Sequence, residues 1–298
     1  MESSGNKWMQ YIKNNKERKI FYIGMLLNEN IDDIPLSGDP IIKLKNNAFS
    51  NVYNKPLKNL LVKTNNYGKK LNYAFGDNSA WQNPTTIVKT RGRDCNSGVI
   101  LRCLDCDRHW SNYYNKPPDI PFDKKHNIIF WRGTTTGELT NKGNRFGLVT
   151  KYYNKHPNID VGFSSICQNN YSFTKYVKGF VSISEMLNYK YIISVEGNDK
   201  DSGLNWKLNS NSLILMPKPR ITSWLMETTL LANFHYVLLK DDFSDLQEKY
   251  EWCENNQDKC KEIIKNANYF MSQFLDNEKE EQLEIDVINT YFDILSSK

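Results

Sequence analysis

The stretch YKYIISVEGNDKDSGLNWKLNSNSLILMPKP, which runs from Tyr189 to Pro219, decides the fold of this chain. It holds two short, mostly apolar runs, Tyr191–Val195 and Ser212–Met216, and each has the length and composition of a buried strand. A helix-compatible segment begins between them at about Ser202, and His235–Leu239 predicts a third strand farther along. Strands that alternate with helices at this spacing predict βαβ units and a parallel sheet.

Short runs of the same kind extend the α/β pattern toward both ends of the chain. Further strands are predicted at Lys19–Gly24, Leu71–Phe75, Thr86–Lys89, Asn127–Trp131 and Ile159–Phe163. Helices are predicted at Trp224–Leu231, from a capping box at Ser244–Gln247, along the apolar stripe Ile263–Leu275 and over Glu278–Leu295. The Pro-rich, charged segment Lys116–Lys125 is the best candidate for a crossing between two domains.

Polar and glycine-rich segments follow two of these strands directly. In a parallel sheet ligands bind at the carboxyl ends of the strands, which is where Glu196–Ser202 is expected. Arg132–Gly137 follows the preceding predicted strand, and its glycines and hydroxyl groups present backbone N–H groups that suit an anion. Arg145, on a helix-compatible run, could aim its guanidinium at the same place, although a solvated helix arginine is the more common case.

A carboxylate also follows a strand in the first part of the chain, at Gly76-Asp77-Asn78. A side chain at this position is well placed to face a cleft. The other interpretation is an Asx-turn, in which the carboxylate only bonds its own backbone. Local sequence leaves both interpretations open, and the Asx-turn is the commoner of the two.

Four residues of zinc-ligand type are crowded together, namely Cys95, Cys103, Cys106 and His109. Structural zinc sites separate two ligand pairs by a dozen residues or more, so buried or incidental thiols are the favoured interpretation. Asp105-Cys106-Asp107 in the same cluster is a pattern common by chance. Cys253 and Cys260 fall seven apart on one predicted helix, too far along its axis for an unstrained disulfide.

Composition excludes several classes of protein. The chain has 298 residues, six cysteines and a formal net charge of +5. This mild excess of basic residues fits a small anionic ligand and not the clustered basic stripe of a nucleic-acid binder. Because no signal peptide or membrane span is recognisable, we expect a soluble, cytoplasmic protein. Six cysteines are too few for a disulfide scaffold, so we expect them to be reduced. We also expect a monomer.

Three motifs in fixed order carry a resemblance to a known family. They are WRGTTTG (131–137) with Arg145, YKYIISVEGND (189–199) with SNSLILMPKP (210–219), and FHYVLLKDDFSDL (234–246). Together they resemble the family 90 glycosyltransferases, which include the Rumi/Notch O-glucosyltransferases, fungal capsule-associated proteins and bacterial lipopolysaccharide-modifying enzymes. The resemblance covers about Asp77 to Phe274. The EGND form looks closest to bacterial and viral members, and the size is similar to that of viral UDP-xylose-dependent xylosyltransferases.

The resemblance implies an α/β fold of the GT-B type, in which two Rossmann-like domains place parallel sheets across a cleft. The expected parts are an acceptor-side domain (1–124), a donor-binding domain (125–277) and a final helix (278–298) that packs back on the first domain. The implied reaction moves xylose or glucose from a UDP-sugar to a hydroxyl of a glycan or glycoprotein, with inversion. No D-x-D motif lies within the matched motifs, so we expect no metal and no other cofactor.

The resemblance also assigns residues. Asp77 matches the catalytic aspartate, with Pro84, Lys89 and Arg91 in the run that follows it. Such a base need accept the acceptor's proton only late in the attack, which is worth roughly 10²–10⁴-fold in rate. The donor-binding residues implied are Arg132, Gly133, Thr134, Thr135, Arg145, Phe163, Glu185, Glu196, Gly197, Asn198, Asp199, Ser202, Gly203 and Lys207.

Within that set, Arg145 matches the arginine that contacts the diphosphate, Thr134 a small hydroxyl residue, and Glu185 an acidic residue near the nucleobase. Gly197–Gly203 corresponds to the loop and helix start under the diphosphate. Many eukaryotic members carry a second diphosphate arginine where this chain has Gly203. Backbone N–H groups and Lys207 would have to compensate for it.

Two other functions remain open at this point. A non-catalytic sugar-nucleotide or glycan-binding protein on the same fold would bind UDP without turnover, and the missing arginine at position 203 favours it. A nucleic-acid-binding module is disfavoured because the basic residues are scattered; its signature would be binding that weakens steeply with salt.

Overall fold

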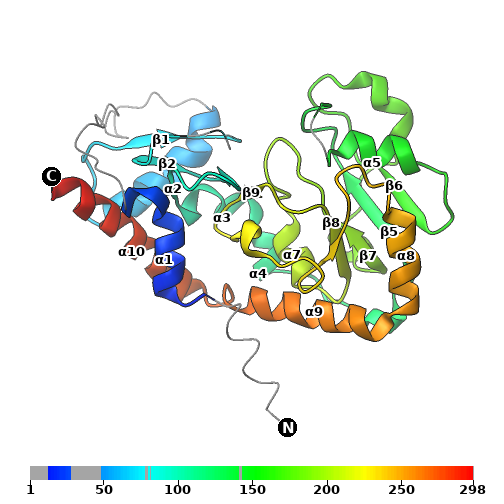
Figure 1. The fold of residues 1–298 in the computed structure, drawn as a ribbon. Helices are drawn as coiled ribbons and strands as arrows, with labels where there is room; N and C mark the ends of the chain where they lie inside the picture. Colours follow the sequence, from blue (N-terminus) through cyan, green and yellow to red (C-terminus); the bar gives the residue numbers. More distant parts are fainter. Residues whose placement is uncertain (1–12, 28–47, 78–79, 81, 141–142, 298) are drawn as a thin grey trace, which may run out of the picture. The chain divides into compact units, whose positions relative to one another are not determined.

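The computed structural model describes residues 13–27, 48–77, 80, 82–140 and 143–297, and the chain forms two compact units (Figure 1). Unit 1 combines residues 1–110, 220–227 and 273–298, and unit 2 combines residues 111–219 and 228–272. Both units contain parallel strands, so the predicted α/β class is confirmed. The GT-B arrangement of two facing sheets stays a prediction.

Unit 2 is built on a parallel sheet that, in the described residues, has five strands in the order β10-β8-β7-β5-β6. This order puts the loop after β5 next to the loop after β7, because the two strands are neighbours and run the same way. The strands are β5 (His126–Gly133), β6 (Ile159–Phe163), β7 (Tyr189–Ile193), β8 (Leu213–Met216) and β10 (Val237–Leu238).

One face of this sheet carries the main core of unit 2. Ile129, Trp131, Tyr191 and Ile193 alternate along their strands and are buried in one apolar cluster. Helices α5 (Arg145–Tyr152), α8 (Leu246–Asn255) and α9 (Gln257–Ser272) contribute residues to it. Helix α7 (Leu204–Leu208) packs with α9 and β8. The short elements of this unit are α4 (Ser111–Tyr114), η6 (Phe122–Lys124), η7 (Tyr171–Tyr176) and α6 (Ile183–Met186).

Unit 1 holds a smaller parallel sheet in the order β1-β2-β4 and an antiparallel pair, β3 with β9. The strands are β1 (Asn72–Ala74), β2 (Thr86–Val88), β3 (Arg91–Gly92), β4 (Val99–Ile100) and β9 (Ile221–Thr222). The helical elements are α1 (Asn15–Ile23), η2 (Gly24–Leu27), α2 (Ala48–Lys63), η5 (Arg102–Leu104), α3 (Cys106–His109) and α10 (Asn277–Ser296), with η8 (Glu227–Thr229) at the boundary between the units.

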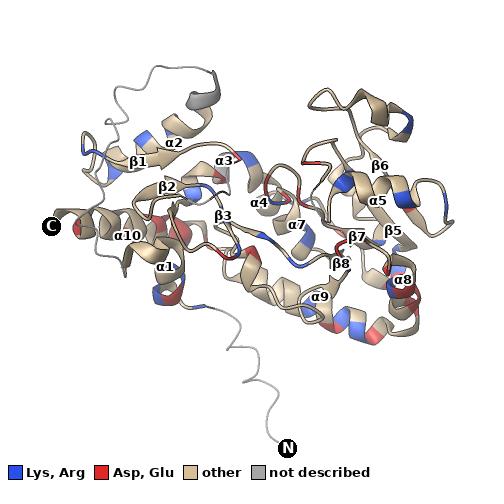
Figure 2. Ribbon diagram, turned by 45° about the horizontal axis from the view of Figure 1, so that its top comes forward, with Lys and Arg blue, Asp and Glu red and all other residues tan. Residues whose placement is uncertain are grey.

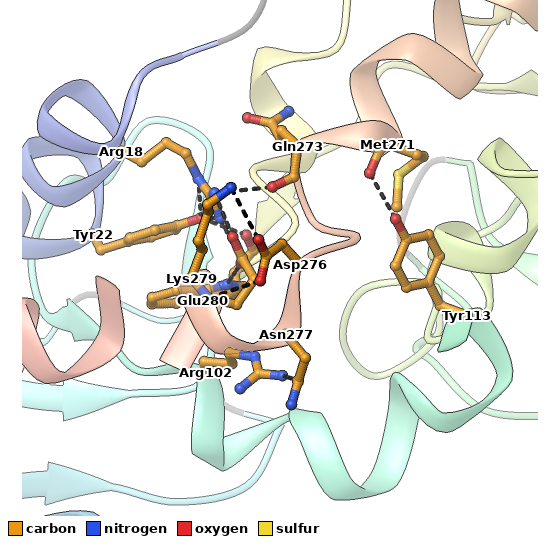
Figure 3. A network of polar contacts seen from close by, with 11 residues as sticks. Arg18, Tyr22, Arg102, Tyr113, Met271, Gln273, Asp276, Asn277, Lys279 and Glu280 are labelled. Carbon is orange, nitrogen blue, oxygen red and sulfur yellow. Dashed lines mark hydrogen bonds and ion pairs between the residues drawn. The ribbon is translucent and has the colours of Figure 1, made fainter. Parts of the chain in front are cut away.

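A buried ion pair joins the distant segments of unit 1 (Figure 3). Both guanidinium Nη atoms of Arg18 donate to the carboxylate of Glu280, at 2.5 and 2.7 Å. The indole N–H of Trp224 donates to the same carboxylate at 2.6 Å, and the ring of Tyr22 stacks on Trp224 with centroids 3.8 Å apart. Helix α1, the 220–227 segment and helix α10 are therefore held by one polar cluster.

The strand predicted at Lys19–Gly24 is wrong, because most of these residues belong to helix α1. Asn14 accepts a hydrogen bond from the backbone of Glu17, whose side chain in turn accepts one from the backbone of Asn14. This capping box starts a helix whose amphipathic face outweighs the β propensity of Ile20–Ile23.

One helix prediction in the second half is wrong, and another helix begins without its predicted capping box. Trp224–Leu231 forms only the short η8 turn, since Met226 takes a left-handed backbone conformation with φ of 59°. The capping box at Ser244 does not form, because Asp245 is the N-cap residue of α8 and the Ser244 N–H donates to Asp242. The helix predicted after Ser244 nevertheless forms as α8, and the remaining helix predictions are confirmed as α9 and α10.

Cys253 and Cys260 lie on two helices, so the prediction of one continuous helix is wrong. The chain bends at Asn256, whose φ and ψ are −133° and 46°. The bend brings the buried Cys260 thiol to 3.5 Å from the backbone oxygen of Cys253, and both cysteines are free thiols. Contact with Cys260, together with burial, raises the pKa of Cys253, so the Cys253 thiol stays protonated.

Charged residues of both signs are interspersed over the described surface. Figure 2 shows acidic and basic residues mixed along α8 and α9, and not a stripe of one sign. In the described part of the chain, every helix is too short or too polar to cross a membrane.

Candidate functional site

Two glycine-containing loops touch at the carboxyl edge of the unit 2 sheet. The backbone N–H of Gly137, after β5, donates to the Asn198 side chain, after β7, at 2.7 Å. A Cβ atom on Gly137 would lie 3.0 Å from the Gly197 oxygen, and Gly137 has a φ of +102°. A Cβ atom on Gly197 would lie 2.8 Å from Thr136 Oγ1. Only glycine allows this close approach of the two backbones.

Arg145 extends its guanidinium toward the contact between these loops. It is the first residue of α5, whose N-cap Asn144 accepts the Gly147 N–H at 2.7 Å. Its Nη1 donates to Thr136 Oγ1 at 2.7 Å and to the Thr134 oxygen at 3.2 Å, while Nη2 donates to the Val195 oxygen at 3.3 Å. Burial lowers the pKa of Arg145, but the guanidinium still remains charged at neutral pH.

Arg145 is therefore not the solvated helix arginine that its local sequence favours. Its hydrogen-bond partners are neutral hydroxyl and carbonyl oxygens, and in the described part of the chain no carboxylate forms an ion pair with it. The Asp201 carboxylate interacts with it electrostatically without a direct hydrogen bond. Within the described residues, its Nε has no hydrogen-bond partner. A cation held in this way at a strand edge is suited to a negatively charged ligand.

Asp201 is a residue of this loop that the sequence analysis missed. Its carboxylate accepts hydrogen bonds from the Ser194 hydroxyl at 2.7 Å and from the Gly203 N–H at 2.9 Å. The ammonium of Lys207 lies 2.5 Å from Asp201 Oδ2. Although burial pulls the pKa of Asp201 upward, Lys207 and Ser194 hold it below its ordinary value. Lys207 and one of the backbone N–H groups expected to replace the second arginine, that of Gly203, thus bind an internal carboxylate.

The space beside Gly203 is also occupied. A Cβ atom there would lie 2.8 Å from the indole Nε1 of Trp206 and 3.4 Å from Lys207. Trp206 is buried in α7, so an arginine at position 203 requires this indole to move. The packing of Trp206 in α7 therefore leaves no room for an arginine side chain at position 203.

Several other predicted residues are engaged away from the loop contact. Arg132 binds both carboxylate oxygens of Asp160 on β6, at 2.8 and 2.9 Å. Thr135 is buried and fastens the loop after β6, since its hydroxyl donates to the Cys167 oxygen and accepts the Cys167 N–H. Phe163 is part of the core. Arg132, Thr135 and Phe163 therefore stabilise the strands and loops at this edge of the sheet through internal contacts.

Glu185 lies at the other end of β7 from the loop contact. It completes the capping box of α6 with Ser182 and is exposed, and β7 begins four residues later. The structure does not bring it to the carboxyl edge. Gly133, Glu196, Asp199 and Ser202 belong to the two loops or directly flank them, with Asp199 buried and Ser202 exposed.

Asp77 lies at the carboxyl edge of the unit 1 sheet. It follows β1 and Gly76, which has a φ of +96°. Lys89 follows β2, the parallel neighbour of β1, and its ammonium lies 2.6 Å from Asp77 Oδ1. The Lys89 side chain is 3% exposed and that of Asp77 is 40% exposed. The carboxylate thus faces solvent on one side and a buried cation on the other. Asn78 lies outside the described residues.

Comparison with known proteins identifies the family. The sequence profile of glycosyl transferase family 90 matches residues 108–298. The chain belongs to glycosyl transferase family 90. The match covers Arg145 and both loops of unit 2 and does not reach Asp77.

Relatives of this family 90 chain occur in bacteria and viruses. It is 37% identical over 223 residues to the O-glucosyltransferase LpsA of Dichelobacter nodosus, which covers 74% of this chain and 66% of LpsA. It is 37% identical over 100 residues to an uncharacterised protein of invertebrate iridescent virus 6 and 35% identical over 92 residues to one of invertebrate iridescent virus 3. Those matches cover 32% and 30% of this chain and 8% of each viral protein. The chain thus spans about two thirds of LpsA and a small part of the viral relatives.

The cysteine cluster of this family 90 chain offers no described metal centre. Cys95 and Cys103 are free thiols, and the side chain of Cys106 lies outside the described part. His109 lies 3.9 Å from the carboxylate of Asp105. Among the residues described, no three His, Cys, Asp or Glu side chains gather closely enough to hold a metal ion.

A hollow of about 810 Å³ lies on unit 2 between the start of α5 and the β10–α8 connection. Gly143, Asn144, Gly147 and Lys151 line one side, and the segment Lys240–Ser244 lines the other. Lys151 donates to the Asp242 oxygen at 3.1 Å across it. Its volume is typical of small-ligand sites.

Proposed function

We propose that this member of glycosyl transferase family 90 moves a sugar from a UDP-sugar to a hydroxyl of a glycan or glycoprotein, with inversion at the anomeric carbon. Glucose is the first candidate sugar because the relative that matches most of the chain is named an O-glucosyltransferase. Xylose is the second, as the resemblance to viral family members implies. The two sugars differ by one hydroxymethyl group.

The proposal rests on Arg145 above all. A charged guanidinium, bound only to neutral oxygens in the recorded hydrogen bonds, stands where two loops meet at the carboxyl edge of a parallel sheet. UDP gains negative charge as it departs, and a cation already fixed in place stabilises that charge without reorganising. Arg145 is therefore assigned to the diphosphate.

Asp77 is assigned the role of general base. An alcohol is too weak an acid to lose its proton before attack, so the carboxylate takes that proton as the oxygen bonds to the anomeric carbon. The C–O bond to UDP breaks as the new C–O bond forms on the opposite face. One displacement needs one base and no covalent intermediate, and inversion follows.

The hollow beside α5 is assigned to the nucleoside of the donor. The hollow borders the helical turn that carries Arg145. A nucleotide whose nucleoside lies in the hollow is therefore long enough for its diphosphate to reach Arg145. Lysines 151 and 240 and aspartates 241 and 242 line it in equal number, which favours a ligand part of little net charge. Glu185, the nucleobase contact expected from the resemblance, is replaced in this role by the lining of the hollow.

A screen for UDP release tests the proposal. The purified chain is incubated with UDP-glucose, UDP-xylose and other UDP-sugars, with and without monosaccharide acceptors, and in each case with and without EDTA. We expect release with one donor, stimulated by an acceptor and unaffected by EDTA. UDP binding without any turnover would instead assign the chain to the non-catalytic sugar-nucleotide-binding class.

A further inference from the structure

The pair formed by Lys89 and Asp77 is strongly asymmetric in its burial. The Lys89 side chain is 3% exposed, whereas that of Asp77 is 40% exposed. A carboxylate with this much solvent contact is hydrated, so it has little need of the lysine for its own solvation. A buried ammonium, by contrast, is costly unless it is paired. The stability of the fold alone does not explain why a lysine is placed here.

The backbone on either side of Lys89 is rigidly held. Lys89 directly follows β2, which lies between β1 and β4 in the unit 1 sheet. Two residues on, the buried guanidinium of Arg91 donates to the backbone oxygens of Phe21, Asn96 and Gly98, at 2.6 to 3.1 Å. Strand pairing before it and these bonds after it fix the stem of Lys89. The buried Lys89 ammonium therefore keeps its position and does not move with the Asp77 side chain.

The segment that carries Asp77 has weaker support. β1 is an edge strand of three residues with intermediate burial throughout, and Asp77 comes after it through Gly76 in a left-handed conformation. Short edge strands and glycine turns give little restraint to a side chain beyond them. The recorded contact that fixes the Asp77 carboxylate is the 2.6 Å bond from Lys89 to Oδ1.

We propose that Lys89 is a positioning residue for the transfer reaction. It holds Oδ1 of Asp77 so that the carboxylate presents its other oxygen to the acceptor hydroxyl. When the acceptor proton arrives, it goes to the free oxygen, and the Lys89 ammonium neither gains nor loses a proton. This inference rests on the proposed role of Asp77 as the base.

Replacement of the charge at constant shape tests the proposal. Lys89→Met keeps the length of the side chain and removes the ammonium. We expect kcat to fall about 100-fold, the loss that a misplacement of about 1 Å brings, while the Kd of UDP stays unchanged. The matched control is Lys63→Met, which removes a lysine from an exposed pair with Glu281 in the same unit and leaves activity as it was. Wild-type kcat in Lys89→Met overturns the proposal.

Chemical rescue separates positioning from packing. Lys89→Ala leaves a hole beside the half-exposed Asp77, which ethylammonium in the buffer can enter. We expect ethylammonium to restore kcat at least tenfold and ethanol, which is of similar size and neutral, to restore nothing. Equal rescue by both compounds, or by neither in a variant that folds and binds UDP, refutes the electrostatic role. An active Asp77→Asn variant refutes the assignment of the base itself, so the two failures are distinguishable.

Discussion

The ammonium of Lys207 lies 2.5 Å from the carboxylate of Asp201, inside the loop that follows β7. Lys207 is 8% exposed and Asp201 11%, so neither side chain is available to a ligand as a free charge. Because Lys207 is paired with Asp201, it does not substitute for the second diphosphate arginine that the family resemblance implies. In the proposed reaction, Arg145 therefore carries the larger share of the charge on the leaving group.

Arg145→Ala is the first prediction that follows. Loss of charged hydrogen bonds to the diphosphate costs about 1.5–3 kcal/mol, so the Kd of UDP rises roughly 10- to 150-fold. The turnover number also falls, because the same contact stabilises departing UDP. Isothermal titration calorimetry with UDP measures the first effect. Exposed Lys259 on α9 of the same unit, changed to Ala, controls for the general loss of positive charge; unchanged affinity in Arg145→Ala would move the diphosphate contact elsewhere.

Asp201→Asn tests whether the internal carboxylate competes with the donor. The amide still accepts the Gly203 N–H but no longer neutralises Lys207 or repels a diphosphate. We expect UDP to bind severalfold more tightly and the fold to lose about 1–3 kcal/mol, since a buried ammonium loses its counter-ion. Calorimetry and urea unfolding measure the two effects. Weaker UDP binding would show instead that the carboxylate shapes the loop for the donor.

Asp77→Asn separates chemistry from binding. The amide cannot accept a proton at neutral pH, so turnover falls by about 10²–10⁴-fold. The Kd of UDP is expected to stay near the wild-type value, because the assigned donor contacts lie in unit 2. Full turnover in this variant would remove Asp77 from the reaction. Exposed Asp94 in the same unit, changed to Asn, is the matched control.

The strands at the donor edge were predictable because buried parallel strands leave a strong local signal. Runs such as Tyr191–Val195 and Ser212–Met216 are apolar throughout and end in turn residues, and they appear as β7 and β8 within two residues. Where strand propensity and a helix-capping pattern compete, the sequence alone does not show which of the two prevails. At Lys19–Gly24 the β-branched and aromatic residues suggested a strand, while the deciding capping box lay upstream at Asn14 and Glu17.

The candidate site was predictable as a set of loops and not as a set of contacts. The rule that ligands bind at strand ends pointed to Arg132–Gly137 and Glu196–Ser202 without any knowledge of their neighbours. The pairing of Lys89 with Asp77 joins residues that are twelve apart and follow two neighbouring strands, and it depends on the register of those strands. Asp201 escaped notice because its role comes from burial beside Lys207, and burial of a loop carboxylate has no sequence pattern.

Glu280→Gln and Arg18→Met probe the polar cluster of unit 1. Each change leaves one charge buried and unpaired at a site where both side chains are 2% exposed, and the cost of such a break is about 3–5 kcal/mol. Urea unfolding measures it. The double variant is expected to lose less than the sum of the two single variants, because it buries no lone charge. Strict additivity would show that the 2.5 Å contact contributes nothing of its own.

His235 gives the chain a dependence of stability on pH. Burial lowers its pKa from 6.5 to about 4, and its Nδ1 accepts the Leu231 N–H at 2.9 Å. The unfolded chain therefore binds a proton more readily than the folded one between these two values. Stability is complete above pH 6.5 and is lost as the pH falls toward 4, where the folded ring also becomes protonated.

His235→Asn removes this titration and keeps an acceptor near the Leu231 N–H. We expect a lower free energy of unfolding than the wild type at pH 7, because the ring fills space against Phe270. The difference between the two proteins should shrink from pH 7 to pH 4.5, since only the wild type loses the contribution of its neutral histidine. Urea unfolding at half-unit steps of pH measures it. Parallel curves for the two proteins would mean that His235 is protonated equally in the folded and unfolded chain.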